Sequence, residues 1–280
     1  PGQWLKIGGT GASYQFATAV LNDWVRVVAV TATKITCDNL PAGWTTDAGA
    51  AKTIRVFFGD RIKNGTTLSS TTIERGFLGQ QTPTYIGQRG MAVNAIALNI
   101  VEGQAVKASA TFIGMSGTEG ITPLDALPDA APDPNLYPVM AAGVNIGRIA
   151  ENGAALASPN WIRTLSLNLQ NGTVEIRAAD SITPVALGRG TLRVMVSTET
   201  YFGSRALYTK ILAGTPTNLN FRLAGNQQAA VFGLPRLTPT RGNPNARGLD
   251  QRVMLPLELR ASVDTLTNAE VMLDRLEYFE

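Results

Sequence analysis

The chain of 280 residues has no histidine and one cysteine, Cys37. A single cysteine cannot form an intrachain disulfide, and without histidine the common zinc-binding sets are excluded. The missing histidine also removes the usual base of a serine-nucleophile triad. We therefore expect no catalytic residue, no metal and no cofactor, and we expect Cys37 to be a small buried apolar residue.

Charge and long apolar runs are also scarce. Charged residues make up 16% of the chain, and no apolar run approaches the about 18 residues of a membrane-spanning helix. The net charge of +3, from 24 basic and 21 acidic residues, is too small to predict nucleic-acid binding. A surface this poor in charge is typical of a protein covered by partners.

What the chain does contain is turn-forming residues, 28 glycines and 15 prolines, beside 44% hydrophobic residues. This composition predicts a mainly β protein with many turns. At roughly 150 residues per domain, the length allows one large or two medium domains. The chain begins at Pro1 rather than Met, and no signal-peptide pattern follows.

The clearest pattern is a pair of strands around residues 93–113. Ile96, Leu98 and Ile100 alternate with small or polar residues, which is the two-residue period of a half-buried strand. After the turn at Glu102-Gly103, alternation resumes as far as Phe112. This stretch predicts a long antiparallel hairpin with one apolar face, which must pack against something else.

A second hairpin is predicted over residues 165–176. Leu165, Leu167 and Leu169 alternate with polar residues, Asn171-Gly172 is a strong hairpin signal, and Val174 and Ile176 alternate on the predicted return strand.

A strand follows over residues 192–196. Ser204 then has the character of a helix N-cap, Leu207 and Ile211 lie four residues apart, and Gly214 is placed to end the helix. Leu219, Phe221 and Leu223 predict another strand.

The N-terminal part predicts short strands at residues 25–30 and 54–58 and a helix within residues 12–22. The run Ile7-Gly8-Gly9-Thr10-Gly11 has some likeness to the phosphate-binding turn of a dinucleotide fold. It lacks a third glycine in the required position, and no βαβ pattern follows, so a plain turn is favoured.

Residues 117–138 form a proline-rich acidic stretch that predicts a long loop or linker. It contains Pro123, Pro128, Pro132, Pro134 and Pro138. Its aspartates Asp125, Asp129 and Asp133 lack the spacing of a calcium loop, so a solvated loop is favoured over a metal site.

Several short motifs occur in a fixed order along residues 54–260. They are Ile73-Glu74-Arg75-Gly76-Phe77, Val93-Asn94-Ala95-Ile96-Ala97-Leu98, Phe112-Ile113-Gly114, Leu212-Ala213-Gly214-Thr215, Leu219-Asn220-Phe221-Arg222-Leu223 and Leu234-Pro235-Arg236-Leu237. In this order they resemble the phage tail tube (major tail) proteins of long non-contractile-tailed bacteriophages.

The resemblance implies a structural virion protein without catalysis, which polymerises as stacked rings into the tail tube and forms the conduit for DNA ejection. The implied fold is mainly β, with β-sandwich or barrel tail-tube domains, one or two short helices and long loops. Two tandem copies are expected: residues 1–116 with an N-terminal extension, a linker at 117–140, and residues 141–280. A chain with two units favours a trimeric, pseudo-six-fold ring, with a hexamer as the alternative.

The resemblance further implies assembly in the host cytoplasm, location in the virion tail, and contact with the tape measure protein and other tail proteins. DNA would pass without specific binding. Two other functions remain open from the residues alone: an extracellular β-sandwich binding module, such as an adhesin or a carbohydrate-binding domain, and a nicotinamide-dependent Rossmann enzyme.

Three groups of residues are candidates for these contacts. The candidate lumen-lining or ring hairpin residues are Val93, Asn94, Ile96, Leu98, Lys107, Ser109, Thr111, Leu165, Leu167, Asn168, Asn171, Gly172 and Val174. The candidate inter-ring loop residues are Ile121, Leu124, Leu127, Leu136 and Tyr137. The candidate outer or subunit-contact arginines are Arg236, Arg241, Arg247 and Arg252.

Overall fold

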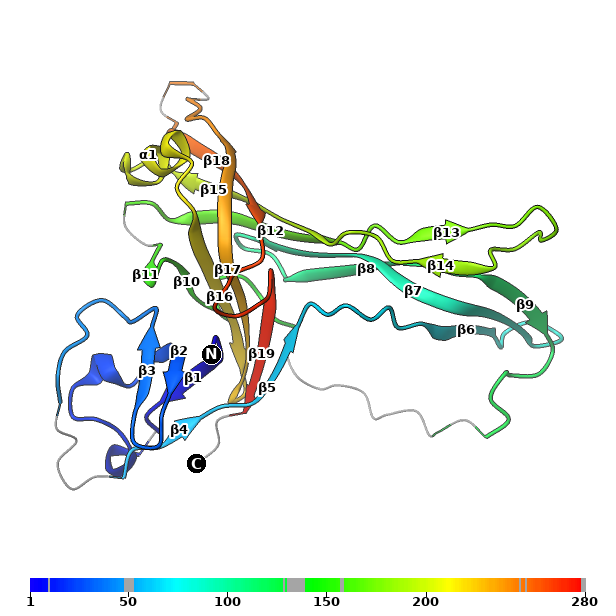
Figure 1. The fold of residues 1–280 in the computed structure, drawn as a ribbon, viewed down its shortest axis with the longest axis horizontal. Coiled ribbons are helices and arrows are strands. Elements are labelled where there is room, and N and C mark those ends of the chain that lie inside the picture. Colours follow the sequence, from blue (N-terminus) through cyan, green and yellow to red (C-terminus); the bar gives the residue numbers. More distant parts are fainter. Residues whose placement is uncertain are drawn as a thin grey trace.

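The computed structural model describes residues 1–9, 11–47, 53–127, 129, 139–156, 159–246, 248, 249 and 251–277. They form a folded body, a long narrow arm that extends from one side of it, and a small sheet at the N-terminus (Figure 1). The structure is mainly β and its strand pairs are antiparallel, which confirms the predicted fold class. Within the described residues the strands do not close into a barrel.

The body and the arm share one large sheet. Its principal strand order is β11-β10-β16-β17-β18-β15-β12-β7-β6. The strands of the body are β10 (Ile146–Glu151), β11 (Ala154–Ala155), β12 (Ile162–Gln170), β15 (Arg193–Tyr201), β16 (Thr217–Gly225), β17 (Gln228–Gly242), β18 (Met254–Ala261) and β19 (Met272–Glu277). The arm contains β6 (Thr71–Phe77), β7 (Thr84–Val101), β8 (Lys107–Ile113), β9 (Ser116–Gly120), β13 (Val174–Ile176) and β14 (Ala186–Gly188). Of these, β13 and β14 form a separate two-stranded sheet.

The core lies where this sheet bends over on itself. One hydrophobic cluster unites leucines of β7 and β12, such as Leu98 and Leu165, with Phe221 of β16 and Leu234 of β17. Alternate side chains of each strand point into it, as the two-residue period requires. The result is a sandwich-like body that buries the apolar face of the predicted hairpins.

Strand β7 joins the body to the arm. Its first half pairs with β6 on one edge and β9 on the other, and its second half pairs with β12 and β8. The predicted hairpin of residues 93–113 is confirmed, with a register that runs from Val93 opposite Phe112 to Asn99 opposite Lys107.

The second predicted hairpin is wrong. Strand β12 is flanked by β7 on one edge and β15 on the other, so no edge remains for residues 174–176. The chain turns away at Gly172, where φ is 60°, and Val174 and Ile176 pair instead with β14. The true hairpin is β12 with β15, and residues 171–192 extend from it into the arm.

The predicted helix after residue 204 is confirmed as α1 (Ala206–Ala213), which ends at Gly214 with φ 59°. Ser204 was wrongly predicted as its N-cap. The cap residue is Arg205, which makes no side-chain cap hydrogen bond. Ser204 is held by Asn160 instead: its N–H donates to Asn160 Oδ1, and its hydroxyl accepts a hydrogen bond from Asn160 Nδ2.

The helix predicted within residues 12–22 is also wrong. Only two 3₁₀ turns form there, η1 (Ala12–Tyr14) and η2 (Ala19–Leu21). The Asn22 side chain accepts the N–H of Phe16 at 2.7 Å and donates to its carbonyl at 2.8 Å, which closes a loop in place of a helix.

The N-terminal sheet has the antiparallel order β3-β2-β1-β4. Its strands are β1 (Trp4–Ile7), β2 (Trp24–Val30), β3 (Ile35–Asp38) and β4 (Val56–Phe57). A dinucleotide fold needs parallel strands joined by helices, so the Rossmann alternative is excluded for these residues. Cys37 is half-buried beside Leu5, Val25 and Val27, less enclosed than predicted, and this burial raises the pKa of its thiol.

A buried carboxylate connects the N-terminal sheet to the body. Asp274 of β19 is fully buried and accepts Trp4 N–H at 3.3 Å and Arg61 Nε at 3.2 Å, where Arg61 belongs to β5 (Asp60–Lys63). Burial raises the pKa of Asp274, and the Arg61 charge opposes part of this rise. Since β5 and β7 share a sheet with β12 and with β15 to β19, the two-domain division at 117–140 stays a hypothesis.

The N-terminal sheet has its own ion pair, which generates a prediction about pH. Arg26 and Asp38 face each other across β2 and β3, with Arg26 Nε 2.8 Å and Nη2 2.5 Å from the carboxylate oxygens. Burial alone would raise the pKa of Asp38, but the Arg26 hydrogen bonds and charge hold it below its ordinary value. The pair therefore contributes stability above about pH 4, and this is lost as pH falls through the folded-state pKa.

We expect Asp38→Asn to lower the urea midpoint at neutral pH, and the difference from the native chain to shrink below about pH 4. Urea unfolding followed by circular dichroism over this pH range measures it. Asp60→Asn is the control, because Asp60 pairs with Arg275 at the exposed surface and should contribute little. A difference that does not change with pH would contradict the prediction.

Candidate functional site

One side of the sheet formed by β8, β7, β12, β15 and β18 is directed toward the core, and the other carries mainly polar side chains. The register places Lys107, Asn99, Ser166, Ser197 and Glu258 in one row across the five strands. The next row is Ser109, Ala97, Asn168, Met195 and Arg260. We call these two rows, with Thr111, Ala95, Gln170, Arg193, Thr164 and Glu199 on the same side, the polar face.

Hydrogen bonds join side chains of the polar face, one between strands β12 and β7 and one within β12. The Ser166 hydroxyl donates to Asn99 Oδ1 at 2.6 Å, and Asn168 Nδ2 donates to Ser166 Oγ at 3.3 Å. Its charges nearly balance, with the basic residues Lys107, Arg193 and Arg260 against the acidic residues Glu199 and Glu258. The face is thus polar, close to neutral and supported from behind by the packed core.

The structure divides the candidate hairpin residues into three groups. Lys107, Ser109, Thr111 and Asn168 lie on the polar face. Leu98, Leu165 and Leu167 are buried in the core, so they support the sheet and cannot line an open surface. The remaining residues lie elsewhere: Ile96 on the core side near the edge strand β8, Val93, Asn94, Asn171 and Gly172 where the arm begins, and Val174 in the arm.

Sequence reasoning missed Asn99, Ser166 and Ser197, which form the centre of the polar face. The signal was present, because these residues alternate with the apolar residues that predicted the strands.

Asn94 and Asn171 hold the arm where it leaves the body. The Asn171 N–H donates to the Asn94 carbonyl at 2.7 Å, and its side-chain amide donates to the Val93 carbonyl at 2.8 Å. Asn94 Oδ1 accepts Thr173 N–H at 3.0 Å. These contacts fasten the chain that leads into β13 to strand β7.

Glycines in the arm provide seats for large side chains. A Cβ on Gly87 would lie 2.3 Å from Leu124 Cδ1, and one on Gly90 would lie 2.9 Å from Met115 Cγ. Leu124 is further held because its N–H donates to Glu74 Oε1 at 2.8 Å. The start of the proline-rich stretch is therefore fixed onto the arm.

Of the candidate inter-ring residues, Ile121, Leu124 and Leu127 follow β9, which lies toward the far end of the arm (Figure 1). Their exposed fractions are 69%, 41% and 89%. Leu136 and Tyr137 lie outside the described residues.

The candidate arginines lie on different surfaces. Arg236 is exposed on β17, and Arg252 lies with its guanidinium 5.8 Å from the centre of the Tyr201 ring. Arg241 is opposite Glu258 in the register, 4.0 Å from its carboxylate, and so borders the polar face. Arg247 lies outside the described residues.

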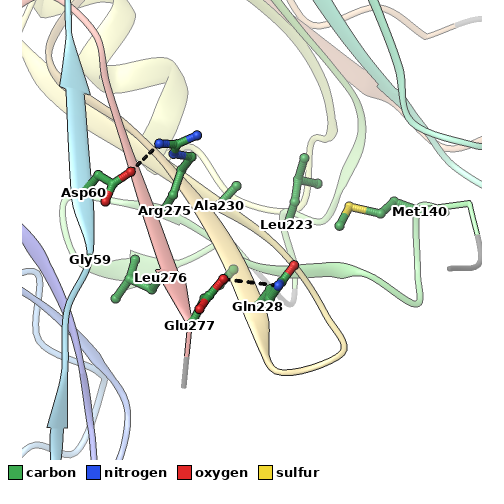
Figure 2. Close-up of a pocket in the computed structure, with 10 residues that line it drawn as sticks. Gly59, Asp60, Met140, Leu223, Gln228, Ala230, Arg275, Leu276 and Glu277 are labelled. Atoms are coloured by element: carbon green, nitrogen blue, oxygen red, sulfur yellow. Dashed lines mark hydrogen bonds and ion pairs between the residues drawn. The ribbon is translucent and has the colours of Figure 1, made fainter. Parts of the chain in front are cut away.

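A surface pocket opens between β5, β19, β17 and β16. Figure 2 shows Asp60 paired with Arg275 on one side, Gln228 with Glu277 on another, and Met140 at the far end. These charged groups are already paired, and the lining has no serine, threonine or cysteine to act as a nucleophile. These contacts therefore hold the strands together and do not indicate a catalytic site.

The arm attachment generates a prediction. Asn171→Ala removes the bond to the Val93 carbonyl, so we expect a loss of about 1 to 2 kcal/mol in the free energy of unfolding. Amides of β13 and β14 should also exchange faster with deuterium. Asn168→Ala is the control, because the Asn168 side chain makes its 3.3 Å bond on the open polar face. Equal effects of the two substitutions on arm exchange would contradict this role.

Among the described residues no group of acidic or cysteine side chains could hold a metal ion, and no helix is long and apolar enough to cross a membrane. No curated protein matched the chain.

One protein family did match. The sequence pattern of the family described as phage tail tube protein covers residues 8–261, which includes the motifs at residues 54–260 and most of the N-terminal sheet. The chain therefore belongs to the phage tail tube protein family.

Proposed function

We propose that this tail tube protein polymerises as stacked rings into a tube whose lumen is lined by the polar face, and that DNA passes through this lumen during ejection. Family membership makes the chain a structural component of the phage tail. The observation that carries the lumen assignment is the polar face itself, with its mainly polar side chains and nearly balanced charge.

The physics of DNA passage supports this choice of surface. Each lysine or arginine that neutralises a phosphate releases counterions and strengthens non-specific binding, so a strongly basic wall would retain DNA. The hydroxyls of serine and threonine and the amide of asparagine bind water without neutralising phosphates. Apolar residues behind the face pack into the core and support the sheet.

Ring formation is proposed to use the edges of the sheet. Among the described strands β8 pairs only with β7, so its outer edge is open to a neighbouring chain. Continuation of one sheet into the next by head-to-tail contact closes a ring when the rotation closes. Arg241, at the border of the polar face, is assigned to such a subunit contact, and Arg236 and Arg252 to outer or subunit-contact surfaces.

A trimeric, pseudo-six-fold ring is proposed over a hexamer. Two hairpins lie side by side, β7 with β8 and β12 with β15, and both continue into the arm. This arrangement supports a chain with two tube units. The exposed residues Ile121, Leu124 and Leu127 are assigned to a neighbouring ring, with Leu136 and Tyr137.

The chain is proposed to assemble in the host cytoplasm around the tape measure protein, to join other tail proteins, and to serve a long non-contractile tail. No catalysis is proposed, since the family is structural. No observation favours an extracellular binding module.

Self-assembly tests the proposal directly. Purified protein at high concentration should form rings or tubes in negative-stain micrographs, because large apolar side chains and open strand edges remain uncovered in the single chain. Native mass spectrometry of isolated rings should give the mass of three chains. A six-chain mass would overturn the ring stoichiometry, and a strict monomer under all salt and concentration conditions would overturn the tube.

The lumen assignment has a separate test. Ser166→Lys with Ser197→Lys adds two positive charges to the polar face of each chain, and we expect assembled tubes to retain duplex DNA more strongly. The salt dependence should steepen by about 0.9 in log–log slope for each phosphate neutralised.

Retention is measured across salt concentrations after nuclease has removed DNA outside the tubes. The matched control, Leu212→Lys with Leu266→Lys, adds the same charge at exposed positions away from the face. If both double variants retain DNA equally, the polar face does not line the lumen.

A further inference from the structure

A groove of about 520 Å³ opens at one end of the sandwich, away from the pocket of Figure 2. Its floor is apolar, with Ile100, Ile146 and Ile149, and its rim carries Trp161, Tyr201 and Arg252. The Trp161 and Tyr201 rings meet edge to face at 6.4 Å, and the Arg252 guanidinium lies against the Tyr201 ring.

The exposure of Trp161 indicates that something covers this groove. Its exposed fraction is 46%, compared with 2% for Trp4 and 5% for Trp24, which belong to the N-terminal sheet and pack against β17 and β19. An exposed tryptophan at the rim of an apolar groove is typical of a binding surface, because a large aromatic ring gains much from being covered.

Two arginines of the groove can pair with an acidic occupant, beside Glu102, which also lines it. Besides Arg252, the groove contains Arg163, whose Nε lies 3.6 Å from Glu102 and whose Nη1 lies 3.8 Å from Glu199. Both separations exceed hydrogen-bond length, so an incoming carboxylate could form shorter, charge-assisted bonds with these guanidinium groups.

This chain contains a segment with the complementary chemistry. Residues 117–138 include five prolines and four acidic residues, with no lysine or arginine. Proline-rich segments in extended form bind aromatic-lined grooves, and Pro132-Asp133-Pro134 places a carboxylate between two prolines. Such a segment offers proline rings to Trp161 and Tyr201 and aspartate to the arginines.

Leu124 and Met140, described residues near the two ends of the segment, are not part of the groove lining. Ala142 and Gly143 line the groove, but Met140 lines the other pocket beside Gln228 and Glu277 (Figure 2). At the other end Leu124 is bound to Glu74 in the arm. A second copy is therefore the better source of the occupant.

We propose that the groove around Trp161, Tyr201 and Arg252 binds the proline-rich acidic segment, residues 121–138, of a second copy of this chain. This rests on the proposed function in one respect, since assembly brings the second copy into reach. The groove would then be the surface that residues 121–138 of a neighbouring chain contact.

The test uses the full chain at a concentration where it is monomeric and a synthetic peptide of residues 121–138. We expect saturable binding that changes tryptophan emission, with the change lost in Trp161→Phe. Arg252→Gln, or a peptide with its aspartates replaced by asparagine, should weaken binding at least about tenfold, the scale of one charge-assisted bond. Arg236→Gln, at an exposed arginine outside the groove, should bind normally.

Three results would overturn the inference. The first is no saturable binding by folded protein, and the second is equal binding by the Arg252→Gln and Arg236→Gln variants. The third is a change in Trp161 emission when residues 128–138 of the monomer are replaced by a glycine-serine linker, which would place the segment in its own groove. Rings without peptide binding would remove this inference alone, whereas peptide binding without rings would remove the proposed tube.

Discussion

The structure depends on the backbone hydrogen bonding of one strand. Strand β7 has 18 residues, which at about 3.3 Å each spans roughly 60 Å, and both of its edges are paired along most of that length. An exposed arm of this kind has little core of its own, so the continuous ladder from body to arm supplies its order. The core residues Leu98 and Ile100, near one end of β7, thereby position side chains at its other end.

Glycines determine how closely the arm can pack. Gly87 and Gly90 lie inside β7, where glycine ordinarily weakens a strand, yet each is the seat of a large side chain from the chain that returns beside it. Gly114 is the reciprocal case, because a Cβ there would meet Met91 Sδ at 2.2 Å. At these three glycines, leucine and methionine side chains pack directly against the backbone of the arm.

The sequence predicted what is local and failed where pairing partners compete. Alternation predicted the strands at residues 93–113, and the four-residue spacing and Gly214 predicted the helix, because both patterns depend on residues close together in the sequence. It could not reveal that both edges of β12 are occupied, so Asn171-Gly172 was misread as a closing turn. The groove also escaped prediction, since Trp161 and Arg252 are brought together only by the tertiary fold.

The buried carboxylate of Asp274 has a consequence for synthesis of the chain. It accepts a hydrogen bond from the backbone N–H of Trp4, 270 residues earlier, and forms an ion pair with Arg61. Contacts of such long sequence separation cannot form during synthesis until β19 has left the ribosome, so β1 and β5 lack these contacts until then. Translation products truncated before β19 would then lack the Asp274 contacts that hold β1 and β5 to the body.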